Sequence, residues 1–201
     1  MFLYNEVQKR EANQERVRVG LIGAGKFGSM FLSQAPFTIG LEVSSIVDIS
    51  VENAKKNCRD VGWTEEQIES VLFFDNLKKM ISQTKIDVLV EATGDPVEGT
   101  KHALIAIEQG LDIVMVNVEA DVLSGPYLAK EAEKAGIVYS MAYGDQPALT
   151  TELVEWARAS GFNVVAAGKG TKYLPEYHYS TPDTVWAVSY THLRAHETDT
   201  D

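Results

Sequence analysis

The sequence is poor in cysteine, in positive charge and in long hydrophobic runs. Cys58 is the only cysteine, so no internal disulfide can form and a thiolate zinc site is not expected. The 18 lysines and arginines are outnumbered by 29 aspartates and glutamates, which gives a net charge of −11. Because an acidic chain repels a phosphate backbone, we expect no nucleic-acid partner.

Uninterrupted apolar stretches are short as well. The longest reach about half of the roughly 20 residues that a membrane helix requires, so we expect no membrane partner. Residues 1–16 are charged and hold no continuous apolar segment, unlike a secretory signal peptide. These features favour a cytoplasmic protein.

Two single residues are assigned no function. Cys58 is expected to be an inert thiol, and His102 is expected to be a packed or surface histidine of a helix.

Short apolar runs alternate with amphipathic segments along the chain. Continuously apolar runs predict strands that helices cover on both faces, at 17–22, 43–47, 71–74, 87–90, 112–116, 137–140 and 163–167. Helical periodicity predicts helices at about 26–35, 51–60, 65–70, 76–83, 97–109, 124–135 and 148–160. This alternation predicts an α/β fold, a Rossmann-type doubly wound parallel sheet with right-handed crossovers.

A glycine-rich turn follows the first predicted strand and opens a helix. Gly23, Gly25 and Gly28, with Lys26 and Phe27 between the last two, match the pattern G-x-G-x-x-G. The first glycine permits a tight turn, the second lets the backbone approach a pyrophosphate, and the third lets helix and strand pack closely. The free N–H groups and the dipole at the helix start favour the anion. These residues are therefore predicted to bind a dinucleotide.

An acidic residue lies at the distance that this motif requires. Asp48 ends the second predicted strand, 20 residues after Gly28. A carboxylate there accepts hydrogen bonds from the adenosine ribose and repels a 2′-phosphate, which favours NAD over NADP. Ser50, Lys55 and Lys56 lie close enough to weaken that preference. Two alternatives stay open at this point, a turn without ligand and a site for S-adenosylmethionine.

Polar residues also follow the fourth and fifth predicted strands. Ligands in this fold bind beyond the carboxyl ends of the strands, so Thr93, Gly94 and Asn117 are predicted to bind the nicotinamide side of the cofactor. Glu119 lies at the same edge, with a solvated loop as its alternative. Asp95 is also expected to cap the helix that Pro96 starts.

A polar segment with neither helical nor strand periodicity follows the last predicted strand. Hydride transfer to a carbonyl needs a proton donor and help for the developing alkoxide. Lys169 and Lys172 are candidates for both roles, and His178 is a candidate proton relay near neutral pH. The alternative is a domain linker with solvated lysines. No metal ligands are predicted.

The sequence resembles a known family at several of these motifs. The VGLIGAGKFG start, the VEATG turn and the VNVE edge are similar to homoserine-dehydrogenase-like NAD(P)-binding oxidoreductases. The stretch GKGTKYLPEYHYSTPDTVW resembles their subgroup of deoxyxylulose-phosphate-reductoisomerase-like (DRL-type, SAF-domain-associated) enzymes. True homoserine dehydrogenases carry an Asn-Lys pair after the fifth strand, whereas Val118 follows Asn117 here. That difference argues against homoserine as the substrate.

The resemblance implies a division of the chain. We expect a helical leader at 1–16, an NAD(P)-binding Rossmann domain at 17–160 and the start of a truncated catalytic domain at 161–187. Residues 188–201 resemble translated adapter read-through, as found in assembled metagenomic genes, and are expected to be non-native. The family members are longer, so we expect the full-length protein to contain more of the catalytic domain and to form a homo-oligomer.

The sequence-based hypothesis is an NAD- or NADP-dependent oxidoreductase. It would transfer hydride between nicotinamide and a small hydroxylated or phosphorylated carbonyl substrate, and coupled isomerisation is left open. Two alternatives remain, a non-catalytic dinucleotide sensor or scaffold and an S-adenosylmethionine-dependent methyltransferase. The lysines and histidine of the polar segment favour the enzyme, because a sensor needs no proton carriers there.

Overall fold

A parallel sheet of six strands forms the centre of the first of two units. The computed structural model describes residues 3–143, 146–168, 179, 181 and 184, and its contacts divide the chain into Met1–Leu149 and Thr150–Asp201. The strands are β1 (Val17–Ile22), β2 (Leu41–Val47), β3 (Leu72–Phe74), β4 (Val88–Glu91), β5 (Asp112–Met115) and β6 (Tyr139–Met141). All pairings are parallel and the order is β3-β2-β1-β4-β5-β6. This is the doubly wound Rossmann arrangement, which confirms the predicted fold class.

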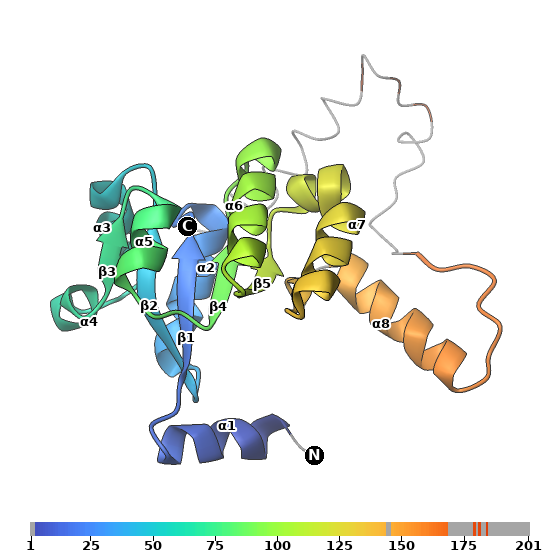
Figure 1. Cartoon of the computed structure of the whole chain (residues 1–201), viewed down its shortest axis with the longest axis horizontal. Helices are drawn as coiled ribbons and strands as arrows, with labels where there is room; N and C mark the ends of the chain where they lie inside the picture. The colour runs from blue at the N-terminus through green and yellow to red at the C-terminus, as the bar shows by residue number, and fades with distance from the viewer. Residues whose placement is uncertain (1–2, 144–145, 169–178, 180, 182–183, 185–201) are drawn as a thin grey trace. The chain divides into compact units, whose positions relative to one another are not determined.

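Helices lie before, between and after the strands along the chain (Figure 1). They are α1 (Leu3–Ala12), α2 (Lys26–Gln34), a 3₁₀ turn η1 (Ala35–Phe37), α3 (Val51–Asp60), α4 (Glu65–Glu69), α5 (Leu77–Gln83), α6 (Pro96–Glu108), α7 (Val118–Ala135) and α8 (Gln146–Ala159). Side chains fix several of their starts, as in the capping box that Thr64 and Gln67 form at α4. No helix in the described part of the chain has both the length and the apolar character that a membrane crossing requires.

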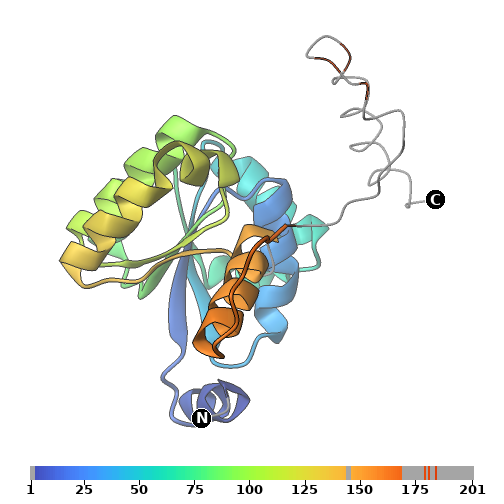
Figure 2. The same ribbon diagram turned by 90° about the vertical axis from the view of Figure 1, so that its right-hand side faces the viewer.

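The sheet separates two hydrophobic cores. On one face Leu89, Ile113 and Met115 pack with Met80 of α5 and Leu128 of α7. The other core is built from alternate strand residues and from α2, α3 and α4, and it includes Leu21, Ile46, Val90, Leu32, Ala54 and Ile68. Figure 2 shows α6 and α7, in green to yellow, across the sheet from α2, in blue. Adjacent strand residues therefore face opposite cores, as the continuously apolar runs require.

Two sequence-based element predictions are wrong. No strand forms at 163–167, where the described chain has no regular structure and Val165 is 90% exposed. A strand needs a hydrogen-bonding neighbour, and no described strand pairs with this run. Helix α7 begins at 118 rather than at 124, because Asn117 caps it. Pro126, typical of a first turn, lies inside this helix instead.

The strand order places a crevice at one edge of the sheet. The chain leaves β1 toward β2 on one side, whereas β4 lies on the other side of β1. Connections that depart in opposite directions open a crevice beyond the carboxyl ends of these strands. The turns that follow β1, β2, β4 and β5 therefore meet at this edge, which we call the carboxyl edge.

Candidate functional site

A large cavity of about 1800 Å³ reaches the carboxyl edge of the first unit. All of the residues predicted to bind the cofactor, except Gly28, line it: Gly23, Gly25, Lys26, Phe27, Asp48, Thr93, Gly94 and Asn117. Residues from four different turns are thus brought to one cavity, as expected when parallel strands end side by side.

The three glycines of the turn are required for different physical reasons. Gly23 has φ +88°, a left-handed conformation that side chains disfavour. A Cβ on Gly28 would lie 2.0 Å from the carbonyl oxygen of Gly23, so only glycine lets α2 pack against the turn. Gly25 has open space, with nothing within 4 Å of its Cβ position. The first and third glycines therefore shape the turn, whereas the second leaves room for a ligand.

The start of α2 differs from the starts of α3 to α7. The N-cap residues of those five helices are Ser50, Thr64, Asn76, Asp95 and Asn117, and the side chain of each accepts a backbone hydrogen bond. The N-cap residue of α2 is Gly25, which has no side chain to cap the helix, and no acidic residue lies in the first turn. Its first N–H groups and its positive dipole end are therefore available to an anion.

Asp48 lies directly across the glycine turn. Its Oδ2 accepts a hydrogen bond from the backbone N–H of Ala24 at 2.9 Å, and its Oδ1 accepts one from Ser50 N–H at 3.0 Å. The carboxylate is partly exposed and lines the cavity. Because each carboxylate oxygen has a second lone pair, Asp48 can hold the turn and still accept hydrogen bonds from a ribose.

The side chains of the residues expected to weaken the preference for NAD all contact partners other than Asp48. Ser50 uses its hydroxyl to cap α3, where it accepts a hydrogen bond from Asn53 N–H. The Lys55 ammonium lies 5.3 Å from the centre of the Phe73 ring, a cation–π contact. Lys56 lies 4.0 Å from Asp60 in the same helix. Both lysines thus have partners away from Asp48.

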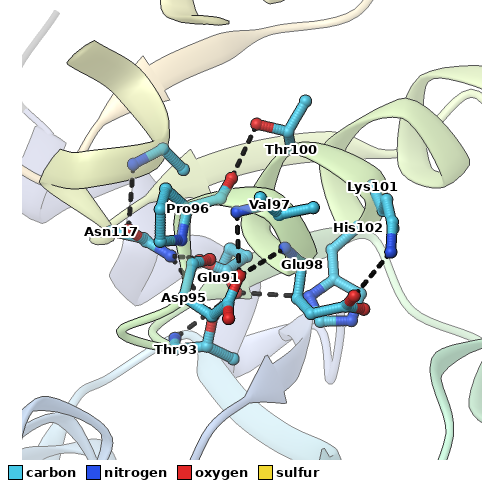
Figure 3. Close-up of polar contacts among 11 residues, drawn as sticks. Glu91, Thr93, Asp95, Pro96, Val97, Glu98, Thr100, Lys101, His102 and Asn117 are labelled. Atoms are coloured by element: carbon cyan, nitrogen blue, oxygen red, sulfur yellow. Dashed lines mark hydrogen bonds and ion pairs between the residues drawn. The ribbon is translucent and has the colours of Figure 1, made fainter. Parts of the chain in front are cut away.

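The turn after β4 is fixed by a network of polar groups around the buried Glu91 (Figure 3). Glu91 is fully buried, and its Oε1 accepts hydrogen bonds from Thr93 Oγ1 at 2.5 Å and from Thr93 N–H at 3.3 Å. His102 Nδ1 lies 3.3 Å from the same oxygen. Asp95 caps α6 by accepting from the N–H groups of Val97 and Glu98, as predicted.

Asn117 connects this turn to α7. Its Nδ2 donates to Thr93 Oγ1 at 3.2 Å and to the Asp95 carbonyl at 2.9 Å, while its Oδ1 accepts from Ala120 N–H. Only 2% of the residue is exposed. Since Asn117 donates both amide hydrogens within the protein, it is suited to holding the turn that contains Thr93 and Gly94 in place. Glu119 is exposed in the first turn of α7 and also lines the cavity.

The predicted catalytic residues lie outside the described part of the chain. Lys169, Lys172 and His178 all belong to the segment 169–178 that the structure does not describe. Cys58, assigned no function, is fully buried, and burial raises the pKa of its thiol to about 11. A thiol in that state is unreactive.

The sequence analysis did not predict the contact between Glu91 and His102. A signal was present, since Glu91 is the one charged residue of the otherwise apolar strand β4. Charged side chains are rarely buried without a partner. The partner itself could not be predicted, because it lies 11 residues further on and its position depends on how α6 packs.

Comparison with known proteins gives two family matches. The model described as homoserine dehydrogenase, NAD binding domain, matches residues 19–142. The model described as oxidoreductase DRL, catalytic domain, matches residues 144–199. The first match covers the sheet and the cavity lining from Val19 to Ala142. No curated protein matches the chain significantly.

Solved structures share the fold at low sequence identity. The WlbA dehydrogenase from Bordetella pertussis, solved with NADH and UDP-GlcNAcA, is 22% identical with a TM-score of 0.51, over 73% of this chain and 43% of that one. A dehydrogenase from Chromobacterium violaceum is 19% identical with a TM-score of 0.54, over 71% and 40%. An NAD binding oxidoreductase from Klebsiella pneumoniae is 17% identical with a TM-score of 0.54, over 73% and 39%. The match thus spans less than half the length of each of these proteins.

Proposed function

Because the chain belongs to the family of homoserine dehydrogenase NAD-binding domains, we propose that it is the cofactor-binding part of an NAD(P)-dependent oxidoreductase. The reaction is hydride transfer between nicotinamide and a small hydroxylated or phosphorylated carbonyl compound. The open space at Gly25, before an uncapped helix, is the observation that carries this proposal. The match to an oxidoreductase catalytic domain at 144–199 favours an enzyme over a sensor or a methyltransferase.

The residues of the cavity fit a dinucleotide. The N–H groups at the start of α2, around Lys26 and Phe27, would bind the pyrophosphate, and Asp48 would accept hydrogen bonds from the adenosine ribose. Thr93 and Gly94 would line the nicotinamide side, and Asn117 would hold them in place. The bound nicotinamide supplies or takes up the hydride, and the protein orients it.

NAD is the preferred cofactor in this proposal. A 2′-phosphate would meet the carboxylate of Asp48, and like charges at close range disfavour binding. The contacts of Lys55 with Phe73 and of Lys56 with Asp60 support the preference, because neither ammonium is placed beside Asp48 to compensate the phosphate charge.

The chemical step is assigned to the segment that follows the first unit. Lys169 and Lys172 would stabilise the developing alkoxide and donate a proton, and His178 would relay it. The substrate, a small molecule, would bind against these residues. The division into a Rossmann domain at 17–160, a catalytic start at 161–187 and a non-native tail at 188–201 is retained as part of the proposal, together with a cytoplasmic location and a homo-oligomer for the full-length protein.

A pair of glycine variants tests the cofactor site. Gly25→Ala adds a methyl group where nothing lies within 4 Å and where φ is −71°, so the fold should keep its stability. The same methyl group blocks the approach of a pyrophosphate, so NADH affinity should fall at least about tenfold, since correct backbone approach is the role of this glycine. Affinity is measured by fluorescence titration and stability by thermal unfolding.

Gly110→Ala is the matched control. Gly110 has φ +68° and open space around its Cβ position, and it does not line the described cavity. Alanine in a left-handed conformation costs about 1 kcal/mol, so this variant should lose stability and keep NADH affinity. Unchanged affinity in Gly25→Ala would contradict the proposed site.

A further inference from the structure

We propose that His102, held by the buried carboxylate of Glu91, accepts a hydrogen bond from the bound dinucleotide through its Nε2. The inference rests on the proposed function and adds a binding residue on α6. His102 lines the cavity, and 17% of its side chain is exposed. Its Nδ1 is directed to a carboxylate that is not exposed at all. The opposite edge of the ring, which carries Nε2, is therefore the edge that the cavity can reach.

The two carboxylate oxygens of Glu91 have different surroundings. Its Oε1 collects three contacts, from the Thr93 backbone, the Thr93 hydroxyl and His102, whereas its Oε2 has no partner among the described residues. A buried carboxylate with an unpaired oxygen costs stability. A buried polar atom without a partner needs an explanation, and the role of Glu91 in orienting Thr93 and His102 supplies one.

The contact with Glu91 also selects the tautomer of the neutral imidazole. Oε1 accepts hydrogen bonds from the N–H and O–H of Thr93, so it acts as an acceptor toward Nδ1 as well. In the neutral ring the proton then lies on Nδ1, and Nε2 carries a free lone pair. A carboxylate that fixes the tautomer of a histidine in this way is a common device for preparing the other nitrogen.

The residues around His102 indicate which kind of group could form a hydrogen bond with Nε2. Glu98, Lys101, His102 and Ile105 form one stripe of α6, at spacings of three and four residues, and all line the cavity. Lys101 is paired with Glu98 at 2.6 Å, so these two charges satisfy each other. The partner of a neutral Nε2 must be a hydrogen-bond donor. A dinucleotide offers three kinds: the adenine amino group, the nicotinamide carboxamide and the ribose hydroxyls.

Two substitutions of the same residue separate binding from structure. In His102→Asn, the side-chain amide takes roughly the place of Nδ1 and can still donate to Glu91, but Nε2 is lost. In His102→Gln, the longer side chain can place an acceptor near the Nε2 position but loses the Nδ1 donor. We expect His102→Asn to keep the melting temperature and to weaken NADH binding about three- to tenfold, the range for one hydrogen bond. We expect His102→Gln to melt lower and to keep more of the affinity.

Dinucleotide analogues identify the donor group. The hypoxanthine analogue of NADH lacks the adenine amino group, and the acetylpyridine analogue lacks the carboxamide N–H. For the analogue that lacks the relevant donor, wild type and His102→Asn should bind equally. If both analogues still favour wild type, a ribose hydroxyl is the donor.

The outcomes distinguish this inference from the proposed function. If wild type binds NADH and His102→Asn binds it within about twofold, a difference smaller than one hydrogen bond provides, the role of His102 is disproved and the dinucleotide site stands. If folded wild type binds no dinucleotide, the proposed function fails, and the role of His102 fails with it.

Discussion

At the scale of single residues, the site separates groups that shape the turn from groups that can contact a ligand. Gly23 has a positive φ, and a Cβ on Gly28 would lie 2.0 Å from the carbonyl oxygen of Gly23, so both positions require glycine. The Cβ position of Gly25 is open. The sequence analysis predicted these roles, because the motif spacing encodes them. It could not predict that both amide hydrogens of Asn117 are used internally, since that depends on the side-chain packing of two neighbouring turns.

Lys169 and Lys172, in the polar segment, are predicted to take part in the chemical step. In a Lys169→Ala/Lys172→Ala variant of the full-length protein, NADH affinity should stay unchanged, while turnover should fall at least about 100-fold, the lower range for a lost general acid. The measurement follows NADH oxidation with a panel of small phosphorylated and hydroxylated carbonyl compounds. Lys134→Ala is the control, because Lys134 lies on α7 and pairs with Glu131. Unchanged turnover in the double variant would remove both lysines from the mechanism.

At the scale of elements, the alternation of apolar and amphipathic segments was sufficient to predict the first six strands. Strands covered on both faces leave a strong signal, and the predicted bounds of β1 agree with the structure. The run at 163–167 carries the same signal without a described neighbour. The predicted start of α7, at residue 124, is six residues too late, because the side chain of Asn117 caps a helix that starts at Val118.

An ion pair between two neighbouring strands gives a prediction at this scale. Arg18 of β1 donates through its backbone N–H and its Nε to Asp87, both at 2.9 Å, just before β4. The guanidinium of Arg18 lowers the pKa of the Asp87 carboxyl. A carboxyl with a lowered folded pKa stabilises the protein above its unfolded pKa of about 3.9 and loses that contribution as the pH falls through the folded value.

Asp87→Asn should therefore destabilise the first unit at pH 7 and progressively less below pH ~4. The Asp87 side chain is 40% exposed, so screening limits the expected loss to about 1 kcal/mol. The measurement is urea unfolding of wild type and variant from pH 7 to pH 3. Asp75→Asn, which breaks an exposed pair within one segment, should have a smaller effect. A loss for Asp87→Asn that does not change with pH would refute the linkage.

At the scale of the whole molecule, the chain combines a complete Rossmann sheet with a match to a catalytic domain. The homoserine dehydrogenase NAD-binding model covers residues 19–142, and the DRL catalytic model covers 144–199. The cavity is lined entirely by residues between Val17 and Tyr143. Cofactor binding is therefore expected to be a property of the first unit, while substrate recognition is proposed to depend on the segment that follows it.

The most direct test of the account is a titration of the chain with NADH and with NADPH, followed by thermal unfolding. A ligand held at 100 times its dissociation constant stabilises a fold by about 2.7 kcal/mol, which shifts the melting temperature by a measurable amount. The account predicts that both dinucleotides raise the melting temperature and that NADH binds more tightly, because Asp48 disfavours the 2′-phosphate. Tighter binding of NADPH would contradict the role of Asp48. A folded chain that binds neither dinucleotide, or that binds S-adenosylmethionine instead, would contradict the central claim.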